Sequence, residues 1–80
     1  MSHPHVEVVY RLDSRGKPHP LQFYWDGRLH EIEDIGREWE EELEWHMLVR
    51  AANERVCELI YNPVLHEWFM KTLPQPPQMV

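Results

Sequence analysis

The chain has 80 residues, of which 42% are hydrophobic, and it carries 14 acidic residues against eight basic ones. This length allows one domain with one core, and the apolar fraction is that of an ordinary globular protein. The single cysteine excludes an internal disulfide and a cysteine-based zinc site within one chain, and the net charge of −6 disfavours sequence-independent binding to nucleic acid.

Residues 6–12 are predicted to form the first strand. Apolar side chains at Val6, Val8 and Tyr10 alternate with other residues, as expected for a strand with one buried face. The following segment, 13–18, contains Asp, Ser, Gly and Pro, and these turn formers end the strand.

The stretch 20–28 gives the clearest local signal in the chain. Leu21, Phe23 and Trp25 fall on one side of an extended strand, and polar residues alternate with them. The next two residues, Asp26-Gly27, suit the positive φ values of a type I′ turn. The segment therefore predicts a β-hairpin with an aromatic inner face.

A third strand is expected to follow this turn. Ile35 is out of phase with Ile32, so a bulge near Asp34 is needed to place both side chains on one face. Gly36 would then permit a sharp bend.

Residues 37–61 fit two periodicities. A helical period gives one apolar stripe, formed by Trp45, Leu48, Val49, Ala52, Val56, Leu59 and Ile60. A period of two gives two strands within 43–51 and 57–61, joined by a turn at 52–55, where Asn53 tolerates a left-handed conformation. Periodicity alone leaves both interpretations open.

The C-terminal part contains one more strand signal. Asn62-Pro63 predicts a turn, after which Trp68, Met70 and Thr72 alternate as in a final strand. The proline-rich segment 74–80 cannot continue a strand and is expected to be a flexible tail, so the domain is assigned to residues 1–73.

Residues of the predicted hairpin and the segment after it resemble a known pattern. It consists of Pro20, Phe23, Trp25, Gly27, Arg28, Ile32, Ile35 and Trp39, followed by Trp45 to Val49, Val56 to Tyr61 and Trp68 to Met70. The pattern is similar to a small uncharacterised bacterial protein family with an F-x-W-x-G-R hairpin, over about residues 18–73. The chain departs from the family at His30, where an aromatic residue is more usual, and at Cys57.

The resemblance implies an all-β fold, and it favours the hairpin over the helix for residues 43–61. We therefore expect a small antiparallel meander or partly open barrel of five or six strands, with Trp25, Trp45 and Trp68 in one core. Some members of the family are associated with error-prone DNA polymerase operons, which implies a link to DNA-damage tolerance. The resemblance supplies no catalytic residue.

Catalytic and metal chemistry find little support in the sequence. His19, His30, His46 and His66 are scattered over different predicted elements, so no metal site is expected. Cys57 is in phase with Leu59 and Tyr61, which predicts a core residue instead of a nucleophile. No catalytic residue, cofactor or metal is assigned.

The candidate partner-binding residues are Tyr24, Arg28, Trp39, Glu41 and Glu42. Tyr24 is predicted to face outward, and Trp39 lies beside an acidic run that spans residues 38–44. An aromatic side chain with a glutamate cluster suits a protein partner that carries Arg or Lys.

These observations predict a non-enzymatic protein-interaction or adaptor module in the cytoplasm, without a membrane segment. Its partner is expected to be an unknown protein or a second copy of the chain. The alternative is a nucleic-acid-binding accessory domain that uses the outer surface around Tyr24 and Arg28, although nucleic-acid binding by the domain alone is not expected at this net charge.

Overall fold

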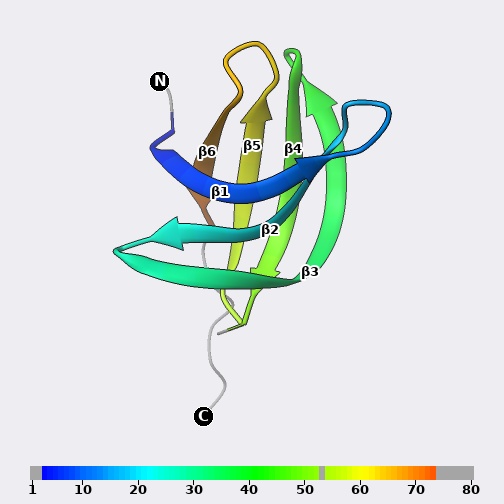
Figure 1. Ribbon diagram of the computed structural model, residues 1–80. Helices are drawn as coiled ribbons and strands as arrows, with labels where there is room; N and C mark the ends of the chain where they lie inside the picture. The colour runs from blue at the N-terminus through cyan, green and yellow to red at the C-terminus, as the bar shows by residue number, and fades with distance from the viewer. Residues whose placement is uncertain (1–2, 53, 74–80) are drawn as a thin grey trace.

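Six antiparallel strands make up the computed structural model, which describes residues 3–52 and 54–73 (Figure 1). They are β1 (His5–Leu12), β2 (Pro18–Trp25), β3 (Arg28–Glu41), β4 (Glu44–Ala51), β5 (Val56–Asn62) and β6 (Glu67–Thr72). Each strand pairs with the next, and β6 pairs with β1, which closes the barrel. The predicted all-β class is confirmed. Nowhere in the described ranges is there a helix able to cross a membrane. The predicted tail, 74–80, lies outside the described residues.

The segment that periodicity left ambiguous is a hairpin. β4 and β5 pair from Trp45–Tyr61 to Arg50–Val56, so the helical interpretation is wrong. The turn between them closes when Ala51 N donates to Arg55 O at 2.9 Å. Glu54 adopts a φ of 64° in this turn, whereas Asn53, for which a left-handed conformation was expected, lies outside the described residues.

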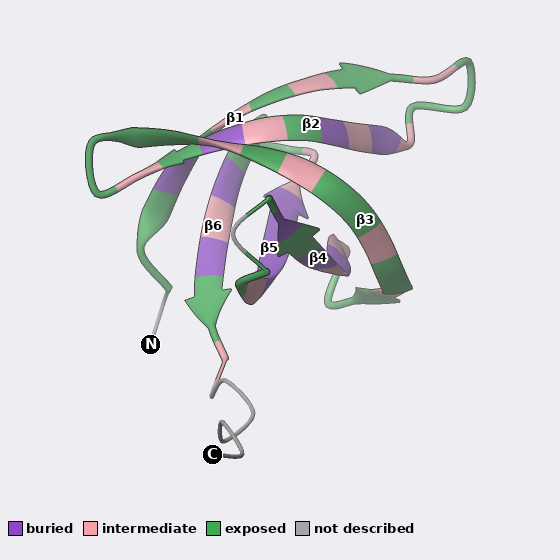
Figure 2. Cartoon of the chain, turned by 90° about the horizontal axis from the view of Figure 1, so that it is seen from below, coloured by how far each residue is buried: buried purple, intermediate pink, exposed green. Residues whose placement is uncertain are grey.

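The core lies inside the barrel and is richest on β4, β5 and β6 (Figure 2). Alternate residues of these strands are buried, as the period-two pattern predicts: Met47, Val49, Ala51, Cys57, Leu59, Tyr61, Trp68 and Met70. Trp68 is in this core, and Trp25 and Trp45 pack against it while partly buried. The rings of Tyr10 and Tyr61 lie 5.2 and 4.9 Å from that of Trp68, centroid to centroid.

A bulge in β2 changes which residues of that strand face inward. Val9 pairs with Gln22 but Tyr10 pairs with Pro20, so Leu21 is an extra residue without a partner on β1. Leu21 is consequently exposed, contrary to the prediction, while Pro20 is buried in its place. The predicted inward positions of Phe23 and Trp25, beyond the bulge, are retained.

Two irregularities bend β3, the longest strand. One lies between Ile32 and Asp34, where a bulge was predicted, and it allows Ile32 and Ile35 to pack against the same core. The second lies between Ile35 and Glu38, beside Gly36. Because of these bends, β3 pairs first with β2 and then with β4. Its C-terminal half thereby places Trp39 opposite His46.

Two tight turns flank β3. Asp26 and Gly27 have φ values of 55° and 71°, which confirms the predicted hairpin turn. Glu42 and Leu43 join β3 to β4 with φ values of 52° and 67°, although neither is glycine. Leu43, which the period-two pattern included in the strand within 43–51, is 84% exposed because it belongs to this turn.

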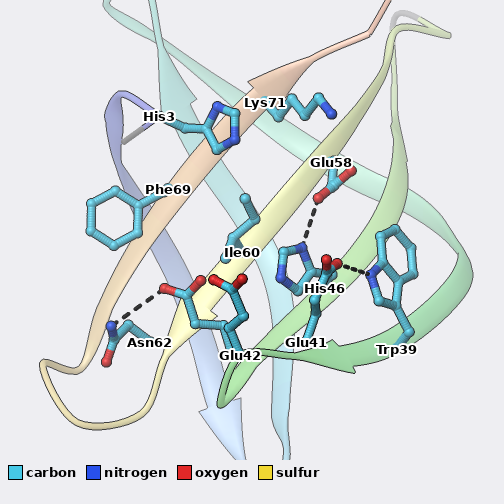
Figure 3. A pocket seen from close by; sticks show the side chains of 11 residues that line it. His3, Trp39, Glu41, Glu42, His46, Glu58, Ile60, Asn62, Phe69 and Lys71 are labelled. Carbon is cyan, nitrogen blue, oxygen red and sulfur yellow. Dashed lines mark hydrogen bonds and ion pairs between the residues drawn. The ribbon is translucent and has the colours of Figure 1, made fainter. Parts of the chain in front are cut away.

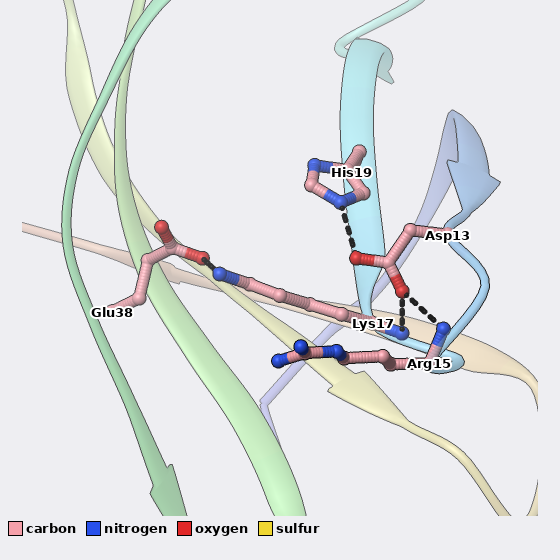
Figure 4. A network of polar contacts seen from close by, with 5 residues as sticks. All are labelled: Asp13, Arg15, Lys17, His19 and Glu38. Atoms are coloured by element: carbon pink, nitrogen blue, oxygen red, sulfur yellow. Dashed lines mark hydrogen bonds and ion pairs between the residues drawn. The ribbon is translucent and has the colours of Figure 1, made fainter.

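The β1–β2 loop is organised by a single carboxylate (Figure 4). Asp13 accepts hydrogen bonds from the ring Nε2 of His19 at 3.0 Å and from the backbone N–H groups of Arg15 and Lys17 at 2.8 and 2.9 Å. These donors, that of His19 foremost, lower the pKa of Asp13 to about 2. The Nζ of Lys17 lies 3.1 Å from Oε1 of Glu38, which links the loop to β3.

Candidate functional site

A hollow lies on the outer surface of β4, β5 and β6 (Figure 3). It has a volume of about 560 Å³, and we call it the β4–β6 groove. Its position follows from strand register, because His46 pairs with Ile60 and Ile60 pairs with Phe69. These residues alternate with the buried core residues of the same strands, so their side chains point away from the barrel interior.

An imidazole–carboxylate pair lies in the groove. His46 Nδ1 donates to Oε2 of Glu58 at 2.8 Å, and the two residues are only 9% and 8% exposed. A polar pair this buried would be costly without its internal hydrogen bond. The pair therefore fixes the orientation of both side chains. No local sequence pattern indicates this pair, because only the β4–β5 register makes the two residues neighbours.

Trp39 forms one wall of the groove. Its indole stacks on the imidazole of His46, with ring centroids 5.3 Å apart and planes at 16°. Its Nε1 donates to Oε1 of Glu41 at 3.3 Å, and the guanidinium of Arg37 lies 5.3 Å from the ring centroid. Three contacts thus hold this aromatic wall in place before any ligand is bound.

Carboxylates gather at the end of the groove nearest the β3–β4 turn. They belong to Glu41, Glu42 and Glu44, and Lys71 lies toward the opposite end in Figure 3. Glu41 and Glu44 are directly paired across the strands, an unfavourable arrangement for like charges. Asn62 Nδ2 donates to Oε2 of Glu44 at 3.4 Å, but no basic side chain of the described residues forms an ion pair with any of the three glutamates.

The floor of the groove is apolar. Ile60 is buried although it faces outward, and the half-buried ring of Phe69 lies beside it. Phe69 also makes an edge contact with His5, at 5.8 Å between ring centroids. The groove therefore combines an apolar floor and an aromatic wall with a negatively charged end.

The five residues predicted to bind a partner occupy two places. Trp39, Glu41 and Glu42 come together at the β4–β6 groove. Tyr24 and Arg28 lie on the β2–β3 hairpin, where both are exposed and Tyr24 pairs with Leu29. The acidic run in the sequence indicated the group at the groove. Tyr24 and Arg28 are not part of the groove.

The described groove lining offers no hydroxyl or thiol nucleophile; its titratable side chains are histidines, glutamates and Lys71. It contains no serine, threonine, tyrosine or cysteine within the ranges that the structure describes. Cys57 is buried on the inner face, beside a separate cavity of about 100 Å³, and burial raises the pKa of its thiol to about 11. Among the described residues, no group of three or more His, Cys, Asp and Glu could hold a metal ion.

The chain shows no significant similarity to a family model, a curated protein or a solved structure. The resemblance drawn from the hairpin pattern, and the link to DNA-damage tolerance that it implies, remain predictions. A functional assignment must therefore rest on the residues themselves.

Proposed function

We propose that the protein is a non-enzymatic interaction module whose β4–β6 groove binds an extended, basic segment of a partner protein. The observation that carries this proposal is the group of carboxylates of Glu41, Glu42 and Glu44, which form no ion pair with the residues that the structure describes and which adjoin an apolar floor. The resemblance to proteins of polymerase operons suggests a process in which such a partner would act, DNA-damage tolerance.

Arginine and lysine side chains match this combination of surfaces. Their aliphatic stems can cover Ile60 and Phe69, while their charged ends reach the glutamates. An arginine guanidinium can pair with a carboxylate through two hydrogen bonds. The net charge of −6 also attracts a cationic segment before contact is made.

Backbone strain next to the groove supports the same proposal. Glu42 and Leu43 hold a left-handed conformation that is unfavourable for residues other than glycine. Such strain collects at functional sites, where the surrounding structure maintains it. Here the turn holds Glu42 at the edge of the groove, beside Glu41 and Glu44.

Fluorescence anisotropy with a labelled octa-arginine peptide tests the proposal, with octa-glutamate as the negative peptide. We expect micromolar binding at about 150 mM salt, and a loss of about tenfold or more when Glu41→Gln and Glu42→Gln are combined. The matched control combines Glu33→Gln and Glu54→Gln, which removes the same charge from exposed residues outside the groove lining. The control should bind like the unmodified protein.

Two results would contradict the proposal. Equal losses in the groove variant and the control would show that net charge alone attracts the peptide. Submicromolar binding of single- or double-stranded oligonucleotides, lost on Tyr24→Ala or Arg28→Ala, would favour the nucleic-acid alternative.

A further inference from the structure

The imidazole of His46 presents an unused acceptor atom to the β4–β6 groove. Its Nδ1 lies 2.8 Å from the carboxylate of Glu58, which only accepts hydrogen bonds, so Nδ1 carries the ring proton. In the neutral ring, the other nitrogen, Nε2, is therefore an acceptor. Within the described ranges, Trp68 Nε1 is the only side-chain polar atom that is both buried and without a partner, so Nε2 is reached from the groove that His46 lines (Figure 3).

The groups next to Nε2 at this end of the groove are acceptors too. Glu44 and His46 are alternate residues of β4, so both side chains lie on its outer side, about 7 Å apart along the strand. Glu41 pairs with Glu44 across the strands. The neutral donors here, Trp39 Nε1 and Asn62 Nδ2, already donate to Glu41 and Glu44. A ligand at this end therefore meets carboxylate oxygens and an imidazole nitrogen.

We infer that the β4–β6 groove selects arginine over lysine in its partner and that His46 is the specificity-determining residue, an inference that rests on the proposed function. A guanidinium has five N–H donors in one plane, so one edge can bond a carboxylate while another reaches His46 Nε2. A lysine ammonium is a compact, strongly hydrated charge, and it loses more hydration beside the apolar floor of Ile60 and Phe69. Acceptors spaced along β4 therefore favour the planar donor.

Fluorescence anisotropy with labelled octa-arginine and octa-lysine, which have the same length and charge, tests the inference. At about pH 7.5 we expect octa-arginine to bind about tenfold more tightly. The double variant His46→Phe with Glu58→Leu removes the buried pair and keeps an aromatic ring against Trp39, and apolar replacement of both partners usually preserves a fold. In it, the ratio of the two affinities should fall to about twofold or less. The control Glu33→Gln removes one charge outside the groove lining and should keep the ratio.

A change of pH tests the same atom in the unmodified protein. Histidine side chains gain a proton between about pH 7.5 and 5.5, whereas carboxylates in general stay ionised. A proton on Nε2 turns this acceptor into a donor, so the ratio of affinities should fall at about pH 5.5. The variant His3→Gln, which removes the other histidine of the groove lining, should show the same fall. The titratable groups that line the groove around His46 are Glu41, Glu42, Glu44, Glu58, Lys71 and His3.

The outcomes separate this inference from the proposed function. Equal affinities for the two peptides at about pH 7.5 would overturn the selectivity and leave groove binding intact. A ratio that persists in the double variant, with the β fold verified by circular dichroism, or that persists at about pH 5.5, would assign the selectivity to the carboxylates and overturn the role of His46. Absence of binding to either peptide would contradict the proposed function, and the inference with it.

Discussion

The turns at the two ends of β3 have nearly the same φ angles, but only the first has residues that favour them. Asp26-Gly27 has φ values of 55° and 71°, and Glu42-Leu43 has values of 52° and 67°. Asp-Gly favours this conformation, whereas leucine at the second position opposes it. The first hairpin is therefore specified by its turn, and the second must be held by the packing of its strands.

The packing that holds the second hairpin lies on both sides of β4. Met47 is fully buried inside the barrel, and His46 stacks on Trp39 outside it. A slip of one residue would exchange these two faces and expose Met47. The register between β3 and β4 is thus fixed by side chains away from the turn, despite the repulsion between the like charges of Glu41 and Glu44, which face each other across the strands.

The largest effect should come from removing the packing of the second hairpin. Met47→Ala should lower the free energy of unfolding by about 2–5 kcal/mol, because it leaves a cavity in the core. Urea denaturation measures the change. Val64→Ala, at an exposed position, should stay within about 0.5 kcal/mol of the unmodified protein. A similarly small effect of Met47→Ala would mean that the turn holds the hairpin after all.

Placing the leucine of the second turn into the first should have the next largest effect. Gly27→Leu should cost about 1–3 kcal/mol in unfolding free energy, the usual cost of an unfavourable backbone conformation. A Cβ atom at Gly27 would have no neighbour within 4 Å, so a clash of that atom does not account for the loss. Thermal or urea unfolding of the variant without a loss would show that the β2–β3 hairpin does not depend on its turn.

The reciprocal change should stabilise the protein. Leu43→Gly relieves the left-handed conformation and should raise the unfolding free energy by about 0.5–2 kcal/mol. Because Glu42 is unchanged, the charge of the β4–β6 groove is preserved. Denaturation and peptide binding measured on the same variant separate the two properties. A destabilised Leu43→Gly variant would show that the exposed leucine makes a favourable contribution that outweighs its strain.

The β1–β2 loop provides a third comparison, because a carboxylate and a glycine act together in it: Asp13 accepts hydrogen bonds within the loop and Gly16 adopts a φ of 80°. Here the effect should be smallest. The pKa of Asp13 lies at about 2 in the folded chain, below its ordinary value of 3.8. Its contribution to stability is present above about pH 4 and is lost as the pH falls toward 2. Urea unfolding should therefore show that Asp13→Asn is less stable than the unmodified protein at neutral pH. The difference should shrink across that acidic window, and a constant difference would contradict the role of ionised Asp13.

Local sequence signals predicted the strands, the Asp26-Gly27 turn and the bulge near Asp34. They failed at Leu21, because the partner strand decides where a bulge falls, and they placed Leu43 in a strand although it lies in a turn. Helix and hairpin were separated for residues 43–61 only by the family resemblance. The acidic run indicated part of the β4–β6 groove. The hydrogen bond between His46 and Glu58 and the position of Trp39 depend on strand register and on the bend of β3, which no local pattern shows.

The closure of the barrel has a consequence for its motions. Within residues 3–52 and 54–73, β1 and β6 share two paired positions, His5 with Phe69 and Val6 with Trp68, with a further hydrogen bond from Met70 N to Pro4 O at 3.0 Å. This seam joins the strands most distant in sequence, and brief local opening is expected where pairing is shortest. Phe69 belongs both to the seam and to the floor of the β4–β6 groove. A segment bound in the groove would therefore hold the seam shut, and amide hydrogen exchange at Val6 and Met70 would slow in proportion to occupancy.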